Sequence, residues 1–197
     1  MKLRDHRFFF NMIWLIILIT IPLPLIITVD NGLETLSSSS GIMGINFGVF
    51  AYTWMLSAIY LSTQPKWLDR IIGLPDMYII HGVTAVFAVV FMWLHDNMLI
   101  SAGLISLTGD ISLYMFTAIL VYSLVFMAGW LTSRVKFLMT IKKGLEKIFK
   151  HELSMWLHRL NLLATLLIYV HIVLIPYIRN IIPFFALVTI YTVIVFV

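Results

Sequence analysis

The stretch MYIIHGVTAVFAVVFMWLH, residues 77–95, decides the fold of this chain. It contains no Asp, Glu, Lys or Arg. A helix rises about 1.5 Å per residue, so about 20 apolar residues cross the roughly 30 Å of hydrocarbon in a bilayer. Residues 77–94 therefore predict a membrane-spanning helix.

The composition of the whole chain is typical of a membrane protein. Of the 197 residues, 61% are hydrophobic and only 11% are charged, which is too little charge to cover a soluble domain. Cysteine is absent, which excludes disulfides, thiolate metal sites and iron–sulfur clusters. The formal net charge of +4 comes from residues between the apolar runs, so no nucleic-acid partner is predicted.

Five further apolar runs accompany the first. The chain is predicted to be an all-α integral membrane protein, a six-transmembrane-helix bundle in one domain over residues 1–197. Pro22 and Pro24 are expected to kink the first span or to end its regular part early. That span is too long for a signal peptide and lacks a small-residue cleavage site, so no cleavage is expected. The predicted spans cover residues 8–29, 44–61, 77–94, 111–131, 154–175 and 181–197.

The placement of lysine and arginine predicts the orientation, because cytoplasmic connections carry an excess of these residues. Eleven of the 13 basic residues precede the first span or lie in the second-to-third and fourth-to-fifth connections. Acidic Asp30, Glu34, Asp96 and Asp110 are on the opposite side. Both termini are therefore predicted to be cytoplasmic, and the expected location is the plasma membrane.

The connection between the fourth and fifth spans has a pattern of its own. Between residues 138 and 150, apolar residues recur every three or four positions, with lysines between them. This pattern is typical of a short basic amphipathic helix on the inner leaflet. Attraction to anionic membrane lipid explains it at least as well as docking of a soluble partner.

Four of the six histidines lie within or at the ends of the third and fifth predicted spans, where polar residues are functional candidates. His81 and His158 are near the cytoplasmic ends, and His95 and His171 are near the outer ends. Both spans run from inside to outside, so the depths match as His81 with His158 and His95 with His171. The two levels are roughly 20 Å apart along each helix.

Two histidines at one depth are suited to binding a porphyrin iron from both sides, because imidazole is a common axial ligand. The sequence therefore predicts two stacked b-type haems, with His81 and His158 on the inner iron and His95 and His171 on the outer iron. Such haems provide an electron path through a bilayer that charge otherwise crosses at great cost. A single histidine at a helix end is more often an interfacial residue, so the set of four carries this prediction.

The spacing on the fifth span raises a geometric question. At about 100° per residue, the step from His81 to His95 returns nearly to the same helix face. The step from His158 to His171 leaves these residues about 140° apart on an ideal helix. Either the fifth span is irregular or strongly crossed against the third, or its two haems lie on different flanks.

These spacings resemble those of the ferric reductase-like transmembrane domain, which NADPH oxidases and ferric reductases share. His81 and His95 match the H-x13-H of the family's third helix, and His158 and His171 match the H-x12-H of its fifth. The similarity covers nearly the whole chain. It includes the approaches to both helices, QPKWLDRIIGLPDMYIIHG at residues 64–82 and MWLHRLNLLATLLIYVH at residues 155–171.

The resemblance implies a haem-containing oxidoreductase. In the family, cytoplasmic NADPH or NADH reduces a flavin, electrons pass to the inner haem, and the outer haem reduces an extracytoplasmic acceptor such as ferric iron, oxygen or a partner protein. No flavin domain and no GxGxxG loop occur in these 197 residues, so FAD or FMN is expected from a separate domain or a flavoprotein partner. No catalytic acid or base is predicted, because one-electron transfer to iron needs none.

Arg159, Phe87 and Phe91 are further candidates for contact with the haems. Arg159, adjacent to His158, is expected either to pair with a propionate of the inner haem or to hold the helix at the lipid headgroups. Phe87 and Phe91 are midway between the two histidine levels of the third span. They are expected to lie between the macrocycles or to serve packing alone.

Two alternative functions are considered. A quinol-linked membrane cytochrome b that serves a separate extracytoplasmic reductase would also hold haems, but the histidine spacings favour the ferric reductase class. A non-redox transporter or assembly subunit would line a polar cavity with its histidines. Transporters typically place further charged residues at mid-bilayer, and spans one, three, four and six have none in their central turns.

Overall fold

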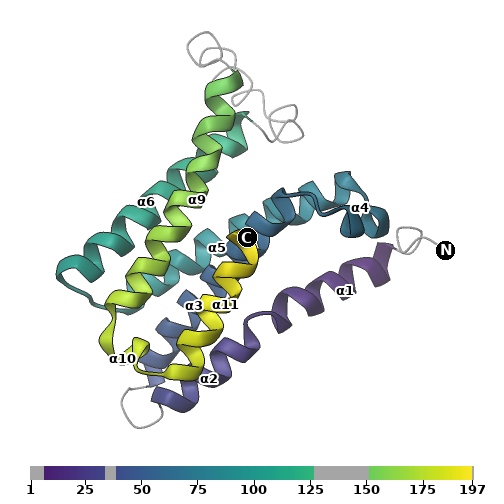
Figure 1. Ribbon diagram of the computed structural model, residues 1–197. Helices are drawn as coiled ribbons and strands as arrows, with labels where there is room; N and C mark the ends of the chain where they lie inside the picture. The colour runs from purple at the N-terminus through teal and green to yellow at the C-terminus, as the bar shows by residue number, and fades with distance from the viewer. Residues whose placement is uncertain (1–6, 34–38, 127–150, 197) are drawn as a thin grey trace.

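The computed structural model describes residues 7–33, 39–126 and 151–196 (Figure 1). All regular elements in these ranges are helices, and no strand occurs among them. The helices are α1 (Arg7–Thr20), α2 (Leu23–Leu33), α3 (Ser39–Ser62), α4 (Lys66–Ile72), α5 (Leu74–Met98), α6 (Gly103–Phe126), α9 (His151–Leu174), α10 (Pro176–Arg179) and α11 (Ile182–Phe196).

Five helical segments are long and apolar enough to cross a membrane, which confirms the all-α, multi-pass membrane class. The sixth predicted span, 181–197, corresponds to α11, which is apolar but has 15 residues and is about 22 Å long. The five longer segments are Met12–Leu33, Gly41–Ser62, Leu74–Met98, Gly103–Leu124 and Trp156–Leu174.

The prolines divide the first of these segments, as predicted. α1 ends at Thr20 and α2 begins at Leu23. Pro22 has no backbone N–H to continue the hydrogen-bond ladder of α1. Its carbonyl instead accepts from the N–H groups of Leu25 and Ile26, at 3.1 and 3.0 Å, and so starts the new helix.

Several helices extend beyond the predicted spans. α5 begins before residue 77 and ends after residue 94, and α6 begins at Gly103 rather than near residue 111. Apolar runs locate the part of a helix that crosses hydrocarbon, whereas the backbone continues its hydrogen bonds into the polar ends. Asp96 and Asp110 therefore belong to helices. The predicted end of the fourth span, at residue 131, and the amphipathic segment 138–150 lie outside the described residues.

Two close helix pairs form the frame of the bundle. α3 packs along α5, and α6 packs along α9. In Figure 1, α6 and α9 rise side by side, and α3 and α5 run together beside them. α5 and α9, which carry the four histidines, are not themselves among the closely packed helix pairs. The histidine-bearing helices are thus each held by a different neighbour.

Small side chains bring these four helices together at mid-length. Ala51 of α3, Ala88 of α5 and Ala164 of α9 are at most 2% exposed, and together with Phe116 of α6 they belong to one larger buried apolar cluster. Small residues allow membrane helices to approach closely without a hydrophobic driving force between them. We call these four residues the waist. In sequence, it falls between the inner and outer histidine levels on both α5 and α9.

A second core joins α2, α3 and α11. Leu25, Val29 and Val188 are almost fully buried in it. Its polar contact is a 2.7 Å hydrogen bond between the hydroxyls of Tyr52 and Thr192, which satisfies two buried polar groups. α11 is thereby packed against α3 on its own apolar core.

The close packing of the waist predicts that two matched substitutions differ in their effect on the melting temperature. Ala164→Leu adds bulk where the side chain is 0% exposed, and overpacking of this kind typically costs about 1–3 kcal/mol. Ala118→Leu adds the same bulk at an exposed position of α6. Thermal unfolding in detergent should show a lower melting temperature for Ala164→Leu alone. Equal melting temperatures in the two variants would show that the waist is not closely packed.

Candidate functional site

The four histidines of α5 and α9 meet as two pairs. The ring centroids of His81 and His158 are 5.9 Å apart with planes at 63°, and those of His95 and His171 are 6.3 Å apart with planes at 81°. All four side chains are half-buried. The histidines that meet in each pair are those predicted from the sequence to lie at the same depth in the membrane.

The α5 histidines are both held by α3. Nδ1 of His81 donates to the carbonyl oxygen of Ala58 at 2.8 Å, and Nδ1 of His95 donates to that of Gly44 at 2.9 Å. A carbonyl oxygen only accepts, so each Nδ1 carries the hydrogen. In the neutral ring, the free lone pair is then on Nε2, the form in which histidine binds a metal.

The α9 histidines are both held by α6. Nδ1 of His171 donates to the carbonyl oxygen of Ile105 at 2.8 Å, and Nδ1 of His158 lies 3.1 Å from the hydroxyl of Ser123. α9 is a single uninterrupted α-helix between His151 and Leu174. The 13-residue step from His158 to His171 is therefore made on a regular helix. Both histidines nevertheless contact the same neighbouring helix, α6.

The second nitrogen of each ring is left available. Among the described residues, no hydrogen bond is found for Nε2 of any of the four histidines. The two nitrogens lie on different edges of an imidazole, so holding Nδ1 on the flanking helix turns Nε2 away from that helix. His81, His95 and His171 thus offer a lone pair on Nε2, and His158 does so in the tautomer in which its Nδ1 donates to Ser123.

The spacing of the rings fits one metal ion between them. An imidazole nitrogen lies about 2 Å from a bound first-row metal, and roughly 1 Å from its own ring centre, so two rings on opposite sides have centres about 6 Å apart. Both measured spacings, 5.9 and 6.3 Å, agree with this value. Within the described ranges, no cluster of three or more His, Cys, Asp or Glu residues is present. Each level therefore brings two imidazoles together, a number that would suit an iron whose other four ligands are porphyrin nitrogens.

Glycines form the surface behind the outer pair. A Cβ atom on Gly48 of α3 would lie 2.7 Å from Nδ1 of His95, and one on Gly109 of α6 would lie 3.2 Å from Cε1 of His171. Atoms essentially never approach a Cβ as closely as the first distance. The outer rings therefore occupy space that a larger residue on either flanking helix would take.

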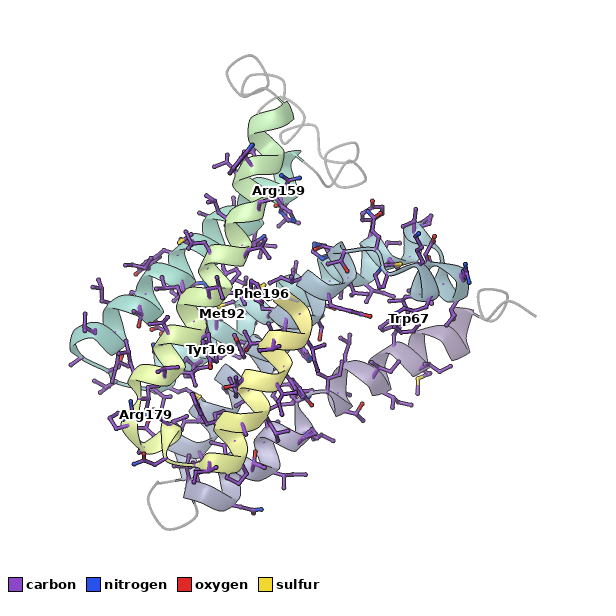
Figure 2. The ribbon with its side chains drawn as sticks, in the orientation of Figure 1. Trp67, Met92, Arg159, Tyr169, Arg179 and Phe196 are labelled. Carbon is purple, nitrogen blue, oxygen red and sulfur yellow. The ribbon has the colours of Figure 1, made fainter. Side chains whose placement is uncertain are left out.

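Arg159 and the two phenylalanines are also placed by the structure. Arg159 is exposed in the N-terminal part of α9, beside His158 (Figure 2). Phe91 packs against α3, with ring centroids 5.0 Å from Trp54 and 5.2 Å from Phe47, and Phe87 lies 6.1 Å from Trp54. The contacts of Phe87 and Phe91 are thus those of side-chain packing against α3.

The residues that hold the histidines were not predicted. The partners Ala58, Gly44 and Ile105 act through backbone carbonyls, which have no signature in a sequence. One signal was present, since Gly44 and Gly48 form a G-x-x-x-G pattern in an apolar helix, which is typical of close helix packing. Ser123 is one of many polar residues in the fourth span, and nothing in the sequence distinguishes it.

No known family matches. Comparison of the whole chain with family models, with curated proteins and with solved structures finds no significant similarity. The resemblance of the histidine spacings to the ferric reductase-like domain therefore stays a prediction, and the geometry of the two pairs is the basis for assigning a function.

The glycine surface gives a test of the outer site. Gly48→Ala forces the ring of His95 or helix α3 to move, so we expect a lower melting temperature. Gly82→Ala, next to His81, meets no atom within 4 Å and gains helix propensity, so its melting temperature should not fall. If Gly48→Ala were as stable as Gly82→Ala, His95 would not rest against α3 as described.

Proposed function

We propose that this chain transfers electrons across the plasma membrane through two b-type haems, each held by one histidine pair. His81 and His158 hold the inner haem, and His95 and His171 hold the outer haem. The observation that carries the proposal is the ring spacing of about 6 Å in both pairs, with every Nδ1 already engaged and every Nε2 available. Ionisable side chains within membrane spans mark functional sites, and four of them in two matched pairs are suited to two similar sites.

The donor set fits haem better than a metal ion bound by protein alone. Each level provides two imidazoles from different helices, and α5 and α9 are not closely packed against each other. Structural metal sites made only of side chains usually need about four ligands. When bound, a haem iron cycles between its ferric and ferrous states and so carries one electron.

The histidines have three tasks at each level. Two of them at each level would hold the iron through Nε2. The hydrogen bond from Nδ1 fixes the ring orientation and increases the basicity of the ligand. The half-buried setting limits access of water to the rings. At His158 the partner is the hydroxyl of Ser123 at 3.1 Å, a longer contact than the 2.8–2.9 Å of the other three histidines to backbone carbonyls.

The waist supports two separate haems rather than one shared group. Ala88 and Ala164 are 0% exposed and pack together with Ala51 and Phe116 between the two levels. All four side chains are apolar, so the waist itself offers no polar group along which a solute could pass. An electron needs no such group, whereas the substrate of a transporter does.

The direction of transfer follows from the proposed topology. We take α11 as the sixth span and place both termini in the cytoplasm, because eleven of the 13 basic residues then face the cytoplasm. The donor is then a cytoplasmic flavin, FAD or FMN, supplied with NAD(P)H by a separate domain or a flavoprotein partner. The acceptor is extracytoplasmic, namely ferric iron, oxygen or a partner protein. This assignment makes the chain a ferric reductase-like transmembrane domain, supported by its histidine spacings.

Arg159 is proposed to pair with a propionate of the inner haem. Its side chain is exposed beside His158, and no ion pair to a carboxylate is found for it in the described part of the chain. A guanidinium group binds a carboxylate through two parallel hydrogen bonds. The residue is thus available for an anionic group at the inner level.

Histidine variants test the proposal. The reduced, purified protein should contain two haems b per chain by the pyridine haemochrome assay. His95→Ala or His171→Ala should retain only the inner haem, because the outer haem would then lack one of its two proposed histidine ligands. His6→Ala, outside the predicted spans, should retain both. Two haems in His95→Ala and in His171→Ala would overturn the ligand assignment.

The hydroxyl of Ser123 gives a finer prediction. Ser123→Ala removes the hydrogen-bond partner of His158, and loss of such a partner typically lowers metal-site affinity about 10–100-fold. Transfer of haem to an excess of a soluble haem-binding protein should therefore be faster for the inner haem. Ser62→Ala, whose hydroxyl bonds only to the carbonyl of Ile59, is the matched control. Equal transfer rates in both variants would contradict a role for Ser123.

A further inference from the structure

A cavity of about 460 Å³ lies between α1, α3, α4 and α11. This volume is in the range of about 300–1,000 Å³ that is typical of small-molecule sites. α4 connects the end of α3 to the start of α5, so the cavity is at the same end of the bundle as His81. Its lining contains no charged side chain, and four aromatic residues contribute to it, namely Trp14, Tyr60, Trp67 and Tyr191.

One hydrogen-bond donor in the lining is uncommitted. Nε1 of Trp67 donates to the hydroxyl of Tyr60 at 3.0 Å, so this hydroxyl accepts and its own hydrogen remains free to donate. The other hydroxyls are engaged, since Tyr191 donates to the carbonyl of Ile21 and Ser57 donates to that of Thr53. Among the described residues of this largely apolar lining, Tyr60 thus provides a hydroxyl hydrogen for which no acceptor is found.

The cavity and the inner histidine pair lie on two sides of one helix. Ser57 and Tyr60 of α3 line the cavity, and Ala58 of the same turn accepts the hydrogen bond from His81. A helix with its side chains is about 10–12 Å in diameter. A ligand in the cavity would therefore be separated from the inner pair by about one helix.

We propose that this cavity binds the ring of an isoprenoid quinone or quinol from the membrane, with Tyr60 donating to a ring oxygen. The aromatic walls suit a flat ring, and the apolar walls suit the first units of the tail. A phospholipid fits less well, because its phosphate would find no cationic side chain in the lining. The binding does not depend on haem. Where the proposed function holds, the site brings a redox-active molecule next to the inner pair.

Titration with menaquinone-2, a quinone with a short tail, tests the site in the full-length chain. The protein is placed in phosphatidylcholine nanodiscs, and quenching of tryptophan fluorescence is followed, because Trp14 and Trp67 line the cavity. We expect saturable quenching. Tyr60→Phe should raise the Kd about three- to tenfold, as expected for one lost hydrogen bond. Tyr78→Phe, which removes a tyrosine hydroxyl outside the cavity, should leave it unchanged.

A second pair of variants tests the space itself. Ile17→Phe adds bulk to the cavity wall and should raise the Kd at least tenfold, whereas Ile16→Phe adds the same bulk at an adjacent residue outside the lining and should not. Quenching that does not saturate, or one Kd shared by wild type, Tyr60→Phe and Ile17→Phe, would overturn the proposal. Failure of menaquinone-2 to displace bound phospholipid would also overturn the proposal.

The outcome is separable from that of the proposed function. Quinone binding is read from tryptophan fluorescence and can be measured in His81→Ala protein, which lacks a ligand of the proposed inner haem. Saturable binding in a protein that never contains haem would support the site and refute the proposed function. Two haems per chain without saturable quinone binding would refute the site alone.

Discussion

The hydrogen bond from each histidine to the helix beside it is the interaction on which the rest of the structure depends. A backbone carbonyl has two lone pairs, and in a helix only one of them is used by the ladder. Ala58, Gly44 and Ile105 use the second lone pair to accept from a histidine Nδ1. Such a bond requires that the neighbouring helix come very close. The tight pairing of α3 with α5 and of α6 with α9 meets this requirement, and Gly48 and Gly109 provide the space that it needs.

The pairing of α3 with α5 and of α6 with α9 also explains why the histidines meet between two helices, α5 and α9, that are not closely packed against each other. Each of α5 and α9 is packed against its own neighbour, so their side chains, and not their backbones, meet at the two histidine levels. The waist draws the two helix pairs together between these levels through small residues. The result is two similar sites at different depths, each with two imidazole nitrogens and each closed off from the other by apolar side chains.

The sequence alone predicted the parts of the fold that depend on hydropathy and on proline. The apolar runs located the five long apolar helical segments, and Pro22 located the break between α1 and α2. Helix ends were less accurate, as for α6, because polar residues such as Asp110 continue a helix beyond the hydrocarbon. The matching membrane depths of the histidines predicted which two of them meet in each pair. Their partners on α3 and α6 were not predictable, because a carbonyl is common to all residues and only the tertiary pairing determines which one accepts.

The electron paramagnetic resonance spectrum of the oxidised, full-length protein tests the central claim most directly. The planes of the two histidine pairs are inclined at 63° and 81°. Two imidazoles inclined this steeply would leave two of the d-orbitals of a shared iron close in energy. Two haems held by these pairs should therefore give two low-spin ferric signals of strong anisotropy. A folded protein with no ferric haem signal, or with only a high-spin signal from iron with an open position, would contradict the account.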